Sequence, residues 1–229
     1  MDLPLIWIIF GVFALLSWVV SSQLDRQLTK YFKIPINYGL TGRDIAQKML
    51  AENGINDVKV QSVAGKLTDH YNPVTKTINL SEAVFYSSSV GAAAVAAHEC
   101  GHAVQHARSY VWLTMRSKLV PVVSFASHWV QWVLLAGLLL LNVFPQLLLF
   151  GIILFGLTTL FSLITLPVEL NASHRALIWL SNANITNYST YPKARSALKL
   201  AAYTYVIAAL SSLGMLVYYL MIYLGRQRE

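Results

Sequence analysis

The stretch Ser89-Val-Gly-Ala-Ala-Ala-Val-Ala-Ala-His-Glu-Cys-Gly-His-Ala-Val-Gln-His106 decides how the rest of the chain is interpreted. It contains the pattern His-Glu-x-x-His. In an α-helix, residues four apart lie on one face, so His98 and His102 can bind one zinc ion together. Glu99 lies beside them and can accept a proton from a zinc-bound water. The stretch therefore predicts a helix that carries two metal ligands and a general base.

The residues around this pattern bear on the main alternative, a helix with two surface histidines. Ala, Gly and Val precede the pattern, and such small residues let a helix pack closely in an interior. Two His and a Glu would be costly to bury there unless a metal or hydrogen-bond partners satisfied them. We expect the helix to run from about Ser87 to Arg108. Cys100 falls on a different face from the histidines, so we interpret it as a small packing residue and not as a ligand.

The composition is typical of a membrane protein. Of the 229 residues, 56% are hydrophobic and 12% are charged, with a mean hydropathy of +0.53. An ordinary soluble domain is about 25% charged. The formal net charge is +7, but the basic residues cluster beside apolar stretches and not among aromatic residues, so we expect no nucleic-acid partner. The single cysteine excludes an intrachain disulfide.

The first apolar stretch, Leu3 to Leu24, has no charged residue and is long enough to span a bilayer as a helix. A cleaved signal peptide is the competing interpretation, but it would need basic residues before the apolar part. The basic residues instead follow, at Arg26, Lys30 and Lys33. This order favours an uncleaved anchor with its N-terminus outside.

Two further uncharged stretches are long enough to span. Residues 119–168 are broken near Pro145, which predicts a hairpin of two helices, and residues 200–225 predict a last span. The expected fold is mainly α and integral to the membrane, with about four transmembrane helices and a small α+β domain. We divide the chain into an anchor (1–24), a catalytic domain (25–118), a membrane hairpin (119–168), a segment with the third ligand and a polar connection (169–199), and a last helix with its tail (200–229).

The polar part predicts three small elements before the zinc helix. Thr41 to Gly54 has a Thr cap at its start and an Asn-Gly stop, which indicates a helix. Residues 58–62 and 76–81 predict two short strands, and Asp69 to Pro73 predicts a turn between them. The second strand either offers an edge to a peptide substrate or only completes a small sheet.

His106 is a rival for the third zinc ligand. It lies eight residues from His98, about 12 Å along the helix axis, which is too far to share one tetrahedral zinc. A metzincin is excluded because Gln105 and Arg108 stand where that class has Gly and His. We therefore interpret His106 as a structural residue or a partner of a ligand.

Glu169 is the better candidate for the third ligand. A hairpin returns to the side that it left, so Glu169 lies on the same membrane face as the zinc helix, next to Pro167. A catalytic zinc site of this class needs one further ligand besides the two His. The alternative is an interfacial acid that pairs with Arg175 or Lys193.

The pattern at residues 98–106, with Leu166-Pro-Val-Glu-Leu-Asn-Ala-Ser173 and Asp69-His-Tyr-Asn-Pro73, resembles the YugP-type neutral zinc metallopeptidases of bacterial membranes over nearly the whole chain. It is more distantly similar to the HtpX-type and CAAX-prenyl-protease gluzincins, whose Glu motif reads roughly E-x-x-A-D-x-x-A. Ser173 stands where that motif has Asp, so the carboxylate expected to orient a zinc-bound His is replaced. The resemblance implies a metalloendopeptidase at the cytoplasmic membrane.

We therefore expect a zinc endopeptidase with one catalytic ion, located in the bacterial cell membrane with several spans and a cytoplasmic catalytic face. The expected partners are the lipid bilayer and a peptide or protein substrate, such as a membrane protein, and the oligomeric state is left open. The residues concerned are Glu99 as general base, His98, His102 and Glu169 as ligands, and Arg175, His174, Ser173 and Tyr71 as candidates for stabilising the oxyanion or for supporting the ligands.

Two functions from other classes compete. A pseudoenzyme or membrane scaffold could keep zinc for structure, in a closed site with a fourth ligand such as His106 or His174. A transporter could use His128 and Gln131, but the spans have no acidic residues and no broken-helix repeats.

Overall fold

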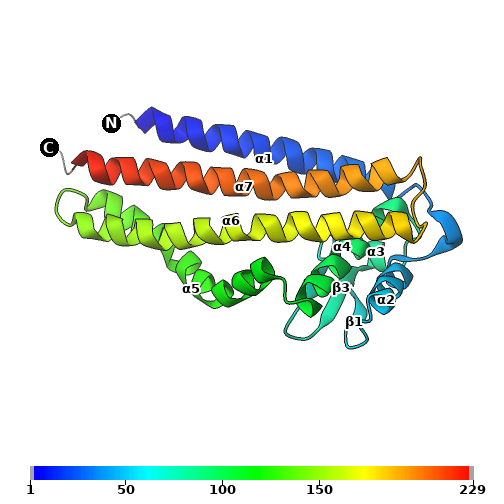
Figure 1. Cartoon of the computed structure of the whole chain (residues 1–229). Helices are drawn as coiled ribbons and strands as arrows, with labels where there is room; N and C mark the ends of the chain where they lie inside the picture. The colour runs from blue at the N-terminus through cyan, green and yellow to red at the C-terminus, as the bar shows by residue number, and fades with distance from the viewer. Residues whose placement is uncertain (1–2, 227–229) are drawn as a thin grey trace. The chain divides into compact units, whose positions relative to one another are not determined.

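The computed structural model describes residues 3–226 and is mainly helical, as the sequence predicts (Figure 1). Among these residues, four helices are long and apolar enough to cross a membrane. This finding confirms the expected fold class, with long helices accompanied by a small sheet. The four are α1 (Leu3–Tyr31), α5 (Val111–Leu139), α6 (Pro145–Asn182) and α7 (Tyr191–Arg226).

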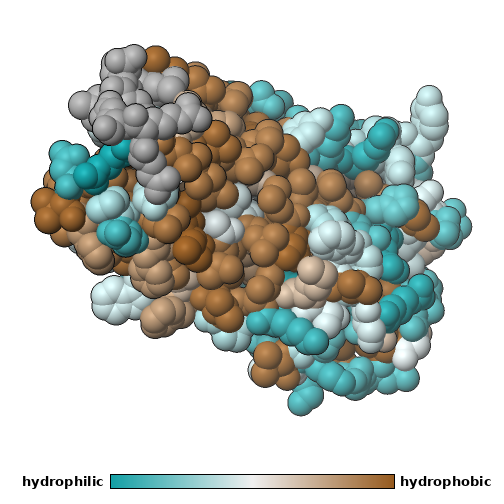
Figure 2. Space-filling view, turned by 60° about the vertical axis from the view of Figure 1, so that its left-hand side comes forward, coloured by the Kyte–Doolittle hydropathy of each residue, from teal (hydrophilic) through white to brown (hydrophobic). Residues whose placement is uncertain are grey.

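The chain forms two compact units. The first takes its described residues from 3–19, 114–166 and 204–226, and the second is formed by residues 20–113 and 167–203. Large apolar side chains of the first unit, such as Phe125 and Leu139, are exposed. Figure 2 shows a broad apolar area on the face in view, with hydrophilic side chains gathered in the remaining part. Such an apolar surface is suited to contact with lipid.

The predicted hairpin is present, but both of its helices are longer than expected. The chain turns at Asn142, between α5 and α6. α5 begins at Val111, before the uncharged stretch, and α6 continues beyond it through Pro167 to Asn182. Neither Gly nor another Pro follows Pro167 within α6, so nothing stops the helix there. The polar connection between the last two long helices is therefore reduced to residues 183–190.

The sheet has three strands in the order β1-β3-β2. β1 (Lys59–Val63) is parallel to β3 (Thr77–Ser81), and β2 (His70–Asn72) is antiparallel to it. The prediction of a turn over Asp69–Pro73 is wrong, because this segment contains β2, and the turn follows where the Asn72 side chain accepts two backbone N–H groups. The prediction that the strand at 76–81 could offer an edge is also wrong. β3 is the central strand, and every residue in it is buried.

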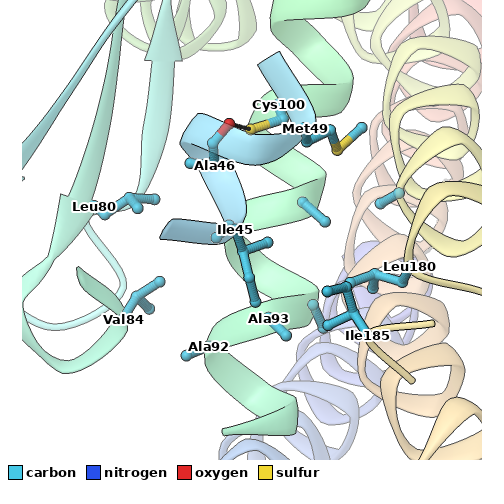
Figure 3. Close-up of a cluster of buried hydrophobic side chains, with 14 of the residues drawn as sticks. Ile45, Ala46, Met49, Leu80, Val84, Ala92, Ala93, Cys100, Leu180 and Ile185 are labelled. Atoms are coloured by element: carbon cyan, nitrogen blue, oxygen red, sulfur yellow. Dashed lines mark hydrogen bonds between the residues drawn. The ribbon is translucent and has the colours of Figure 1, made fainter. Parts of the chain in front are cut away.

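The core of the second unit is built largely from helices α2 (Gly42–Glu52) and α4 (Val90–Ala107), with the short α3 (Glu82–Phe85) and β3. A 3-10 turn at Asn37–Gly39 has no buried residue. The predicted Thr41 cap is confirmed as a capping box with Asp44. Cys100 is buried and its thiol donates to the Ala46 carbonyl at 3.5 Å, which confirms the packing interpretation (Figure 3). The labelled side chains of this core come from α2, β3, α3, α4, α6 and the segment after α6: Ile45, Ala46, Met49, Leu80, Val84, Ala92, Ala93, Cys100, Leu180 and Ile185.

Candidate metal centre

Three side chains from the second unit converge on one point. His98 and His102 project from the same face of α4, and Glu169 projects from α6. Glu169 Oε2 lies 3.3 Å from His98 Nε2 and 3.5 Å from His102 Nε2. Their possible ligand atoms all lie within 4.8 Å of one another. The structure thus brings together the three residues that the sequence assigns to a metal.

These distances match a tetrahedral zinc ion. Zinc binds His nitrogen and carboxylate oxygen at about 2.0–2.1 Å, so neighbouring ligand atoms of a tetrahedron lie about 3.3 Å apart. The separations of 3.3 and 3.5 Å agree with this value. Two imidazole nitrogens and one carboxylate oxygen are also ligand types that zinc prefers. The residues present therefore fit a zinc ion.

Each ligand histidine has a hydrogen-bond partner at its other ring nitrogen. Ser173 Oγ lies 3.1 Å from His98 Nδ1, so a hydroxyl occupies the place where the related motif has a carboxylate. Gln105 Oε1 lies 3.1 Å from His102 Nδ1. Such partners orient metal-binding imidazoles. The sequence suggested Ser173, but it did not suggest Gln105.

The spacing of Gln105 is one signal that could have pointed to it. It lies three residues after His102, so the two side chains lie close on the helix surface. It is also a large polar residue in a helix whose other buried residues are mostly Ala, Gly and Val. The Gln105 side chain is completely buried, and its Nε2 donates to the Val168 carbonyl at 2.8 Å and to Asn171 Oδ1 at 3.0 Å.

Glu99 follows the first ligand on α4 and is buried. The pKa of its carboxyl group is raised to about 7, chiefly by burial and also by the negative charges of Glu169 and Asp69. The charge of His98 and a hydrogen bond from the Tyr71 backbone act in the opposite direction. A carboxyl group with a pKa near neutrality can both accept and release a proton.

α4 and α6 approach each other closely at Gly101, which lies inside the His-Glu-x-x-His pattern. A Cβ atom on Gly101 would lie 2.6 Å from the backbone oxygen of Ala172 and 3.0 Å from its Cα. Glycine is required here because the two backbones leave no space for a side chain. This contact holds Glu169 and Ser173 within reach of His98.

Gly101→Ala is therefore expected to destabilise the protein and to weaken metal binding. The added methyl group meets backbone, which can move only if α4 and α6 separate. Overpacking of this kind costs about 1–3 kcal/mol, and the separation would move Glu169 away from both histidines. The measurements are Tm in detergent and the zinc content of the purified protein.

Gly156→Ala is the matched control. Gly156 is a helical glycine of α6, and no atom lies within 4 Å of the Cβ that would be added there. Its Tm and zinc content should equal those of the wild type. If Gly101→Ala also keeps wild-type values, the close backbone contact is contradicted.

The other predicted site residues have different surroundings. Arg175 Nε donates to Asn171 Oδ1 at 2.7 Å, and His174 is exposed. The Tyr71 hydroxyl lies 2.8 Å from His106 Nδ1, and burial raises the pKa of Tyr71 to about 12. The structure therefore gives Tyr71 and Arg175 hydrogen-bond partners outside the three ligands.

The contacts also bear on two alternatives, namely Glu169 as an interfacial acid and zinc in a closed structural site. Glu169 Oε2 faces the two histidines, whereas Lys193 donates to the Ser189 carbonyl and Arg175 Nε donates to Asn171 Oδ1. Within residues 3–226, no fourth metal-binding side chain joins the three ligands. A closed structural site would need one.

Comparison with known proteins agrees with this centre. The sequence model of a family described as "Putative neutral zinc metallopeptidase" matches residues 6–224. The chain is also similar to the "Putative membrane protease YugP" of Bacillus subtilis (strain 168), with 42% identity over 214 residues that cover 93% of this chain and 94% of that protein. No solved structure matches the chain.

Proposed function

This chain belongs to the neutral zinc metallopeptidase family, and on that basis we propose that it is a membrane-embedded endopeptidase that uses one zinc ion. His98, His102 and Glu169 are the proposed ligands, and Glu99 is the proposed general base. The observation that carries the proposal is the pair of Nε2 to Oε2 distances, 3.3 and 3.5 Å, which are close to the edge of about 3.3 Å in a zinc tetrahedron. Three protein ligands leave one position open, as in catalytic zinc sites.

A zinc ion supplies a Lewis acid that polarises a peptide carbonyl and lowers the pKa of a water molecule. Glu99 lies beside His98, where its carboxylate would take a proton as the oxygen of a water molecule bonds to the peptide carbonyl carbon. It would then give this proton to the amine nitrogen as the C–N bond breaks. The pKa of Glu99, raised to about 7 by burial, suits both transfers near neutral pH.

The substrate is proposed to bind along β2. This strand is an edge of the sheet, and its Tyr71 backbone is hydrogen-bonded to Glu99. A peptide that adds to an exposed edge is held by main-chain hydrogen bonds and lies extended. A cavity of about 340 Å³, lined in part by Tyr71, Ala103 and His106, lies beside this strand and can accept a side chain. Each of these features supports a peptide substrate.

We propose a location in the bacterial cell membrane with the catalytic face in the cytoplasm. The four apolar helices support membrane insertion. Arg26, Lys30 and Lys33 directly follow the apolar part of α1, and such a basic segment favours the cytoplasmic side. A membrane protein with a segment unfolded near the bilayer is the proposed substrate class, because β2 can pair only with an extended chain.

Removal of zinc is expected to abolish cleavage. The protein is purified in detergent, its zinc content is measured by mass spectrometry, and cleavage of unfolded casein is followed on gels. We expect o-phenanthroline to stop cleavage and added zinc to restore it, because the ion is needed to polarise the carbonyl. The isomer m-phenanthroline does not chelate and serves as the control. Cleavage that persists in a zinc-free sample would contradict the proposal.

A further inference from the structure

We propose that Gln105 is a positioning residue for the zinc site. With Asn171 and Arg175 it forms a hydrogen-bond chain that places the proton of His102 on Nδ1 and leaves the Nε2 lone pair facing Glu169. The inference rests on the proposed function, because it concerns the same zinc site. It assigns a role to the residue that stands where a metzincin would have glycine.

Two groups that hydrogen-bond to the Gln105 and Asn171 amides have fixed roles, one as donor and one as acceptor. Arg175 is charged and can only donate, and its Nε donates to Asn171 Oδ1 at 2.7 Å. The backbone carbonyl of Val168 can only accept, and it lies 2.8 Å from Gln105 Nε2. Neither group can reverse its role. The amides between them are therefore oriented from both sides.

The orientation of the Gln105 amide follows from these two groups. Its Nε2 group donates one hydrogen to Val168 and the other to Asn171 Oδ1, at 3.0 Å. If the amide were flipped, its oxygen would face two acceptors, and the Gln105 side chain is completely buried, so no solvent could relieve the repulsion. Gln105 Oε1 is therefore the atom that faces His102.

An amide oxygen can only accept, so His102 Nδ1 must donate to it across the 3.1 Å separation. A neutral imidazole carries one proton, so Nε2 then has a free lone pair. That nitrogen lies 3.5 Å from Glu169 Oε2 and is the atom that a zinc ion would bind. These hydrogen bonds thus leave His102 Nε2 able to bind a metal ion in the metal-free protein.

The two ligand histidines differ in how firmly this proton is placed. His98 Nδ1 faces Ser173, whose hydroxyl can either donate or accept. The proton of His102 is instead placed by the Gln105 amide. The orientation of that amide is fixed by the Val168 carbonyl and, through Asn171, by Arg175. We therefore expect His102, and not His98, to depend on a remote amide for its affinity for zinc.

The first experiment compares Gln105→Met with the wild type. Methionine has a similar volume but no polar hydrogen. Zinc affinity, measured by competition with a chromogenic chelator, is expected to fall about 10- to 100-fold. In metal-free protein with ¹⁵N-labelled histidine, NMR should place the His102 proton on Nδ1 in the wild type, and should show loss of this preference in Gln105→Met.

Val104→Ala is the matched control for a general loss of stability. Val104 is buried next to Gln105 on α4, and its truncation leaves a cavity without touching the hydrogen-bond chain. It should keep wild-type zinc affinity and the wild-type His102 signal. If Gln105→Met binds zinc as tightly as the wild type, or if Val104→Ala loses as much affinity, the proposal is overturned.

If Gln105→Met fails to fold, a pair of substitutions at Asn171 tests whether the hydrogen-bond chain supports zinc binding by His102. Asn171→Asp keeps an oxygen acceptor for both Gln105 and Arg175, and should keep zinc affinity, whereas Asn171→Leu should lower it. Equal affinities of the two variants would overturn the proposal. The NMR measurement needs no metal and no cleavage, so a wild-type protein that binds no zinc would contradict the proposed function while this test of Gln105 still gives its own answer.

Discussion

Glu99→Gln is expected to bind zinc normally and to lose nearly all peptidase activity. Glutamine has the size of glutamate and can still accept the hydrogen bond from the Tyr71 backbone, so the buried site keeps its packing. It cannot take a proton from water, and general-base catalysis contributes about 100- to 10,000-fold to rate. The measurements are kcat/KM for casein cleavage and the number of zinc ions per chain.

Glu52→Gln is the control for this substitution. Glu52 is an acid of α2 that forms an exposed pair with Lys48, outside the metal centre. It should keep wild-type activity. If Glu99→Gln cleaves as fast as Glu52→Gln with the same zinc content, Glu99 is not the base, although the ligand assignment would stand.

Glu169→Ala is expected to lose its zinc. Glu169 Oε2 faces both histidines, so its removal leaves two ligands, and two ligands do not make a catalytic zinc site. Changes to residues that only support ligands already cost about 10- to 100-fold in affinity, and loss of a ligand should cost more. Zinc content after dialysis against a weak chelator measures the effect, and cleavage should fall with it.

Glu82→Ala provides the comparison for loss of a carboxylate. Glu82 is an exposed acid at the start of α3. It should retain zinc through the same dialysis. Full retention by Glu169→Ala would remove Glu169 from the ligand set and leave the two histidines without a third partner.

The sequence predicts the long helices and the placement of His98 and His102 on one helix well because both depend on simple local signals. Uncharged stretches show which segments are apolar, and the spacing of His98 and His102 requires only a helix. Glu169 was predicted from topology, because a hairpin returns the chain to its starting side. The boundaries were less accurate. Absence of charge shows where an apolar surface ends, but α6 continues through Pro167 to Asn182, with no Gly or further Pro after Pro167.

The errors concern features that depend on distant partners. β2 is only three residues long, too short for an alternating pattern, and it exists because it pairs with β3. Which strand is central depends on pairing between segments, so β3 could not be distinguished from an edge. Gln105 was missed for the same reason, since its partners on α6 are 63 and 66 residues away. Spacing shows that Gln105 is near His102, but not that it is buried against α6.

The contact between Gly101 and Ala172 has a consequence for the order of synthesis. A ribosome completes His98, Glu99 and His102 long before it reaches Glu169, and two long apolar helical segments are made between them. A chain that ends before α6 contains the base and two ligands, but lacks the third. A partly synthesised chain of the proposed enzyme therefore lacks a complete set of zinc ligands and is expected to have no peptidase activity.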